Sequence, residues 1–147
     1  MKKIISIDIG GTFIKYGLVD EAGVVLCKDK KVTVKSGAED FVDELCDIVN
    51  LYKDNSDILG VSISMPGFIN NKEGIPVACS YLRFIENYKL QDELASRTNL
   101  EVRIENDANC VALAEKFNGN ATECEDFICI TIGTCLLYTS PSPRDRS

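Results

Sequence analysis

Histidine is absent from the sequence, and none of its seven cysteines belongs to a Cys-x-x-Cys pair. The chain therefore offers neither ligand pattern that is typical of a structural zinc site. No apolar run approaches the length of about 18 residues that crosses a bilayer, and the first run ends at Asp8, too early for a signal-peptide core. A net charge of −7 without a basic stripe disfavours nucleic acid as a partner. We expect a cytoplasmic domain with reduced thiols, outside any membrane.

The most informative segment that is present is Ile7–Asp20, where a carboxylate and two glycines join two apolar, strand-like runs. Glycine takes positive φ without steric cost and lets backbone N–H groups approach an anion, so Gly10 and Gly11 favour a phosphate-binding turn. Thr12 adds a hydroxyl donor, and Asp8 suits Mg²⁺, usually through water, because Mg²⁺ prefers oxygen ligands. An ordinary β-hairpin turn is the alternative. Because another strand follows, the segment is neither a Walker loop nor a dinucleotide-binding turn.

A second candidate site lies at Ile104–Cys110, where a short strand-like segment ends and an apolar helical pattern begins. Ligand sites in α/β sheets are commonly found where strands end and helices begin. The carboxylate of Asp107 can accept a proton there. The alternative is structural, because Asn and Asp are preferred helix N-caps, and Asn106 or Asp107 would then satisfy the first N–H groups of the helix.

Two further segments end at turn-forming residues. Gly60–Ile69 is a buried-looking strand that runs into Pro66 and Gly67, a pair that suits a type II turn. Phe127–Thr134 is an apolar strand that ends in Gly and Thr. The local sequence by itself favours an ordinary turn at Pro66 and Gly67 as the alternative to a binding site.

Taken in chain order, the four segments resemble the ROK family of kinases and repressors, within the sugar kinase, actin and Hsp70 superfamily. The resemblance implies that Asp107 is the catalytic base, that Asn106 binds sugar hydroxyls and that Asp8 organises Mg²⁺ through water. It places the contacts to the ATP phosphates at Gly10, Gly11, Thr12, Gly133 and Thr134. Weaker sugar-binding candidates are Pro66, Gly67 and Asn87.

The expected fold class is α/β: a ribonuclease-H-like (actin-like ATPase) lobe with a mixed five-stranded sheet and flanking helices. Apolar periodicity predicts helices at residues 39–52, 90–97 and 108–117. It predicts strands at residues 3–9, 13–19, 24–34, 58–64, 102–105 and 126–132. Ser36 and Glu39 resemble a capping box at the start of the first helix. A loop or small hairpin is expected after residue 64, and the aromatic residues of segment 81–88 either cover a sugar or, as we favour, fill the core.

The end of the sequence does not continue these patterns. Written back into codons, Cys135–Asp145 resembles a transposon-end sequencing adapter read in frame, whereas a native Ser/Pro-rich tail is the alternative. We therefore expect residues 1–134 to be one natural lobe and residues 135–147 a non-native, disordered tail. The missing half of the parent protein would then carry the zinc site and adenosine pocket that the resemblance implies, and the parent would be a homodimer.

The function that the resemblance implies for the intact parent is transfer of the ATP γ-phosphoryl group to a hydroxyl of a hexose or related sugar. The chain alone, with one lobe of two, is expected to be inactive. One alternative is the sugar-binding body of a ROK repressor, which is disfavoured because DNA-binding helices precede that body in the family. Another is a non-catalytic sugar-binding fragment. Glucose, a β-glucoside, fructose and an N-acetylated amino sugar all fit as the substrate.

Overall fold

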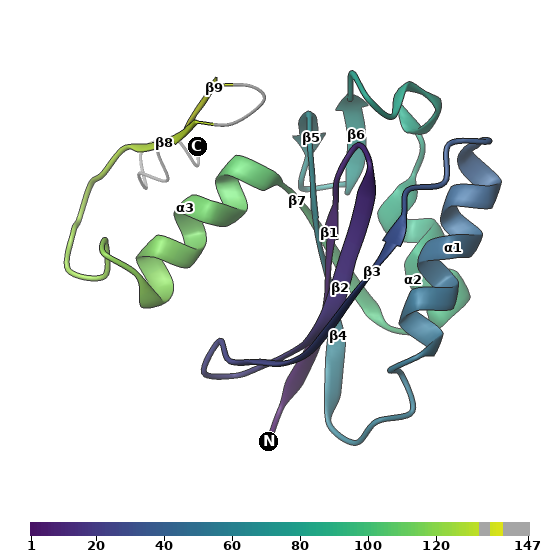
Figure 1. Ribbon diagram of the computed structural model, residues 1–147, viewed down its shortest axis with the longest axis horizontal. Helices are drawn as coiled ribbons and strands as arrows, with labels where there is room; N and C mark the ends of the chain where they lie inside the picture. Colours follow the sequence, from purple (N-terminus) through teal and green to yellow (C-terminus); the bar gives the residue numbers. More distant parts are fainter. Residues whose placement is uncertain (133–135, 140–147) are drawn as a thin grey trace. The chain divides into compact units, whose positions relative to one another are not determined.

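The computed structural model describes residues 1–132 and 136–139 of the chain (Figure 1). Contacts divide the protein into two compact units, of which the first is Met1–Glu105 and the second begins at Asn106. Among the described residues, no helix is both long and apolar enough to span a bilayer. The candidate site residues are distributed over both units.

The first unit is built on a five-stranded sheet with the order β3-β2-β1-β4-β7. Its strands are β1 (Lys3–Ile9), β2 (Phe13–Asp20), β3 (Val25–Val32), β4 (Ile58–Met65) and β7 (Glu101–Asn106). β1 with β2, and β2 with β3, form antiparallel pairs across short turns, whereas β1 and β4 are parallel and need a helical crossover. The sheet is therefore mixed, which confirms the predicted fold class.

The core lies between this sheet and two helices, α1 (Ala38–Asn50) and α2 (Leu90–Thr98), which run side by side in Figure 1. Alternate residues of β1 and one face of α1 bury their side chains there, because side chains repeat every two residues in a strand and every 3.6 in a helix. The buried residues of these two elements include Ile5, Ile7, Ile9, Phe41, Leu45, Ile48 and Val49, each at most 2% exposed. The same alternation directs Asp8 to the other face of the sheet.

The start of α1 differs from the predicted capping box. Gly37 is the N-cap, and no side chain caps the helix. The Ser36 hydroxyl donates instead to the carboxylate of Asp40, and the Glu39 carboxylate accepts a hydrogen bond from Arg97 of α2 at 2.7 Å. The prediction was wrong because a charged partner on a neighbouring helix competes with the local backbone for Glu39.

Between β4 and α2 the chain forms a small hairpin, as the sequence allowed. Its strands are β5 (Phe68–Asn70) and β6 (Ile75–Ala78), and a 3₁₀ helix, η1 (Arg83–Ile85), follows. The segment around η1 fills the core as we favoured: Leu82 and Ile85 are fully buried, and the ring of Phe84 packs edge-on against Phe41 at 5.6 Å. Tyr81 is the exception, because half of its surface is exposed.

The second unit begins with α3 (Asp107–Asn118) and includes β8 (Cys129–Ile132), which pairs antiparallel with β9 (Leu136–Thr139). β8 is shorter than the predicted strand at residues 126–132, and its described partner is β9 in a two-stranded sheet. We expected disorder in the segment that contains β9, but residues 136–139 pair with β8. Residue 135 and residues 140–147 lie outside the described residues, and the non-native origin of the tail stays a prediction.

Candidate functional site

Asp8 is held in an exposed position near the end of β1. The strand pairing places Ser64 of β4 on one side of it and Lys15 of β2 on the other. The Ser64 hydroxyl donates to Asp8 Oδ1 at 3.1 Å, and Lys15 Nζ lies 3.9 Å from Asp8 Oδ2. The Lys15 side chain is 70% exposed, so water screens this ion pair strongly. Asp8 therefore has a defined orientation while its carboxylate stays open to solvent.

The turn from Gly10 to Thr12 is held by its own backbone and by Thr33, which follows β3. The Gly10 N–H donates to the Phe13 carbonyl at 2.9 Å. The buried Thr33 side chain donates to the Gly10 carbonyl at 2.8 Å, and the Thr33 N–H donates to the Thr12 carbonyl at 2.9 Å. Within the described part of the chain, the N–H groups of Gly11 and Thr12 donate to no other group. The turn thus presents two backbone donors on a fixed frame.

The reason for the two glycines differs from the one inferred from sequence, because neither Gly10 nor Gly11 has positive φ. A Cβ at Gly10 would lie 2.9 Å from the Phe13 carbonyl oxygen, closer than real side chains approach. A Cβ at Gly11 would lie 3.6 Å from the nearest atoms, which belong to Tyr81, and that is an ordinary van der Waals distance. Close approach of two backbone segments explains Gly10, whereas the turn itself has room for a side chain at residue 11.

The predicted turn after β4 is present at Pro66 and Gly67. Gly67 has φ of +102°, the positive value that a type II turn needs at its third residue. A Cβ on Gly67 would overlap with the carbonyl oxygen of Ala78, so the end of β6 packs directly against this turn. Asn87 is exposed, has φ of +61°, and donates its N–H to the Pro76 carbonyl at 2.7 Å. The weaker sugar-binding candidates therefore all lie on segments that adjoin β6.

Asn106 and Asp107 lie where β7 ends and α3 begins, as predicted. Asn106 is the N-cap of α3: its Oδ1 accepts hydrogen bonds from the N–H groups of Ala108 and Asn109 at 2.9 and 3.1 Å. The capping alternative is therefore confirmed for Asn106. Asp107 is the first residue of α3, is half-buried, and accepts a hydrogen bond from the Ala108 N–H at 2.8 Å. Its role as a base stays a prediction, as does a cleft shared with Asp8.

Asp8 is the predicted magnesium-binding residue in this part of the protein. The described residues contain no group of three or more His, Cys, Asp or Glu side chains that could hold a metal ion. Mg²⁺ does not require such a group, because it usually keeps several waters and binds one or two carboxylates together with substrate phosphates. The exposed Asp8 carboxylate and the adjacent Ser64 hydroxyl fit this oxygen chemistry. Gly133 and Thr134, the other predicted phosphate contacts, lie outside the described residues.

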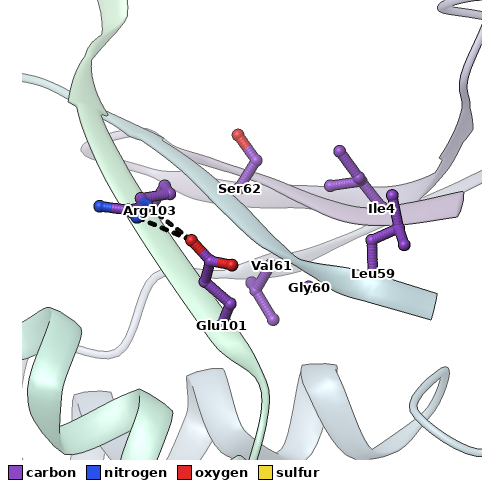
Figure 2. A pocket seen from close by; sticks show the side chains of 7 residues that line it. All are labelled: Ile4, Leu59, Gly60, Val61, Ser62, Glu101 and Arg103. Atoms are coloured by element: carbon purple, nitrogen blue, oxygen red, sulfur yellow. Dashed lines mark hydrogen bonds and ion pairs between the residues drawn. The ribbon is translucent and has the colours of Figure 1, made fainter.

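Described residues of the first unit line hollows that can be compared with the predicted sites, and two of them are relevant here. The larger has a volume of about 280 Å³ and is lined by Ile4, Leu59, Gly60, Val61, Ser62, Glu101 and Arg103 (Figure 2). An ion pair of 2.7 Å joins Glu101 and Arg103 at its edge. The smaller hollow, of about 170 Å³, includes Asp8 and Lys15. None of the predicted sugar contacts lines either hollow, so neither coincides with the predicted sugar site.

Two side chains that shape the site, Thr33 and Ser64, were not anticipated from the sequence. Both lie within predicted strands, but their contacts with Gly10 and Asp8 depend on which strands pair and in what register. The only local signal is the alternation Ser62-Ile63-Ser64, which places hydroxyl groups on the face of β4 opposite the core.

The mixed sheet, its flanking helices and the glycine turn beside Asp8 define a lobe of the actin-like ATPase fold. Residues 4–136 match the ROK family, and the chain belongs to that family. A β-glucoside kinase of Listeria innocua is 38% identical over 134 residues, which cover 90% of this chain and 44% of that protein. The chain thus spans less than half the length of this relative. Family membership confirms the resemblance drawn from the four sequence segments.

Solved structures show the same fold. A ROK family glucokinase from Streptomyces griseus, determined in complex with glucose and AMPPNP, has a TM-score of 0.82 and 34% identity over 94% of this chain and 44% of its own. A ROK family transcriptional regulator, a homolog of the E. coli MLC protein, has a TM-score of 0.85 and 24% identity over 95% of this chain and 36% of its own. The regulator shows the shared fold alone, whereas the Listeria innocua and Streptomyces griseus relatives, which are more similar in sequence, are named as sugar kinases.

Proposed function

We propose that the intact protein is a sugar kinase that transfers the γ-phosphoryl group of ATP to a hydroxyl of a hexose or β-glucoside. The observation that carries this proposal is the exposed Asp8 beside a turn that presents the N–H groups of Gly11 and Thr12. Relatives named β-glucoside kinase and glucokinase support it, including a glucokinase solved with glucose and AMPPNP. Asp8 and Asp107 both lie within the segment that matches the ROK family.

At the phosphate side, each residue of the turn has a separate task. Gly10 keeps the turn narrow, while Gly11 and Thr12 donate hydrogen bonds to phosphate oxygens through their N–H groups. The Ser64 hydroxyl orients Asp8 by donating to Oδ1. Mg²⁺ bound through water at Asp8 would neutralise charge on the phosphate oxygens. We assign Gly133 and Thr134 to the same phosphates.

At the sugar side, Asp107 accepts the proton of the attacking hydroxyl. The hydroxyl oxygen then forms a bond to the γ-phosphorus as the bond to the leaving ADP breaks, so positioning of both substrates governs the rate. Asn106, whose Oδ1 caps α3, is also a proposed sugar contact. Pro66, Gly67 and Asn87 are the remaining proposed sugar contacts.

The test uses the intact protein, expressed from the uninterrupted gene, in an assay of ADP release with glucose, a β-glucoside, fructose and an N-acetylated amino sugar. Asp107→Asn should lower kcat by at least about 100-fold, as expected for loss of a general base. Asp92→Asn is the matched control, because Asp92 is also an acidic residue in the first turn of a helix, α2, but belongs to no proposed site. Near-normal turnover by Asp107→Asn would reject the assignment of the base.

A non-catalytic sugar-binding protein is the second candidate, since a ROK transcriptional regulator shares the fold. It predicts sugar binding by calorimetry without sugar-dependent ADP release in the wild-type protein. A sugar kinase predicts both. The 147-residue chain by itself should show negligible turnover, because the proposed phosphate contacts and the sugar must be enclosed by two lobes.

A further inference from the structure

Cys79 connects the Pro66–Gly67 turn to the loop that precedes α2. It follows β6 directly and is only 1% exposed. Its thiol donates to the Pro66 carbonyl at 3.1 Å, and its N–H donates to Glu86 Oε1 at 2.9 Å. One residue therefore contacts the turn after β4 with its side chain and the loop after η1 with its backbone.

The packing around these two hydrogen bonds is tight. A Cβ on Gly67 would lie 3.0 Å from the Cys79 Cα, so the backbone of this turn and that of Cys79 approach each other closely. The Cys79 carbonyl accepts the N–H of Leu82 at 3.0 Å, and the Pro76 carbonyl accepts the N–H of Asn87 at 2.7 Å. Movement of Cys79 would therefore displace both segments that carry the weaker sugar-binding candidates.

We propose that Cys79 and Glu86 are positioning residues of the sugar site, which fix the Pro66–Gly67 turn relative to Asn87 and thereby set the affinity for sugar. This inference rests on the proposed function. Neither side chain is assigned a contact with the sugar. The bond to the Glu86 carboxylate is charge-assisted and the thiol is a weak donor, so loss of Glu86 should have the larger effect.

The first test measures KM and kcat in the intact protein. Cys79→Ala should raise the KM for sugar about fivefold, as expected for loss of one hydrogen bond, while kcat and the KM for ATP stay unchanged. Cys79→Ser should recover most of the affinity, because its hydroxyl can donate to the Pro66 carbonyl. Glu86→Ala should raise the sugar KM further. Glu86→Gln should return the sugar KM toward the wild-type value, because its amide oxygen can accept the hydrogen bond from the Cys79 N–H.

Cys27→Ala is the matched control, because Cys27 is an exposed cysteine on β3, outside the turn. A second measurement uses the wild-type protein, so its result does not depend on whether the variants fold. Cys79 is only 1% exposed, so iodoacetamide reaches its thiol when the turn opens transiently. Labelling of Cys79, followed by peptide mass spectrometry, should slow in saturating sugar, because a sugar bound against the turn favours the packed state. Labelling of Cys27 should stay the same.

The outcomes separate the two proposals. If the wild-type protein phosphorylates sugar but the sugar KM is unchanged in Cys79→Ala and Glu86→Ala, the positioning role is overturned and the kinase assignment stands. Equal labelling of Cys79 with and without sugar, in a wild-type protein that phosphorylates sugar, also overturns the positioning role. If the wild-type protein phosphorylates no sugar, the proposed function is overturned, and the positioning role with it.

Discussion

Gly10→Ala and Gly11→Ala form a matched pair that tests how the turn after β1 is built. An alanine Cβ at residue 10 would lie 2.9 Å from the Phe13 carbonyl oxygen, which also accepts the N–H bond that closes the turn. The turn must open, and overpacking of this kind costs about 1–3 kcal/mol of folding free energy. At residue 11 the nearest atoms are 3.6 Å away, so alanine fits. Alanine has less conformational freedom than glycine in the unfolded chain, so Gly11→Ala should stabilise the folded protein by between zero and about 1 kcal/mol.

The assay is urea unfolding of the intact protein without nucleotide, followed by circular dichroism, and then the KM for ATP. Gly10→Ala should lower the free energy of unfolding, whereas Gly11→Ala should not. Gly11→Ala should nevertheless raise the KM for ATP, because a side chain at residue 11 limits how closely a phosphate can approach the adjacent backbone N–H groups. Equal destabilisation of the two variants, or full stability of Gly10→Ala, would refute the geometric reasoning.

Two further predictions concern the core and the pH dependence of stability. Phe41→Ala should lower the free energy of unfolding by about 3–5 kcal/mol, because Phe41 is fully buried, whereas Phe68→Ala at a 68% exposed position should change it by about 0.5 kcal/mol or less in the same titration. The Arg97 guanidinium lowers the pKa of the Glu39 carboxyl from its ordinary value of 4.5. The stability that this pair contributes is therefore present above pH 4.5 and is lost as pH falls through the lower folded-state pKa. Urea midpoints between about pH 6 and about pH 3 should fall less steeply in Arg97→Gln than in the wild type, and parallel curves would contradict this interpretation.

The sequence predicts those parts of the fold in which local pattern and tertiary burial agree. Ile5, Ile7 and Ile9 of β1 are buried in the core, whereas the residues between them are not, and the predicted bounds of the strand at residues 3–9 match the structure. α1 carries its apolar residues on one face, and Phe41, Leu45 and Ile48 are buried as the periodicity requires. In both elements the burial that stabilises the fold follows the period of the backbone.

Other features depend on partners that are distant in sequence. The local sequence predicts a capping box because Ser36 precedes Glu39 by three residues, but Arg97, on another helix, binds the Glu39 carboxylate. The sequence suggests positive φ as the reason for Gly10, whereas the structure shows a close contact with Phe13. The hydrogen bond between Ser64 and Asp8 requires a parallel pair of strands in one register, and no local pattern specifies that register.

We propose that the turn beside Asp8 and the carboxylate of Asp107 act on the same pair of substrates. The most direct test is a crystal structure of the intact protein with a hexose and a non-hydrolysable ATP analogue. We predict that the N–H groups of Gly11 and Thr12 contact phosphate oxygens and that Asp107 lies within hydrogen-bond distance of the sugar hydroxyl that faces the γ-phosphate. A structure in which Asp8 and Asp107 open onto different surfaces would contradict the claim.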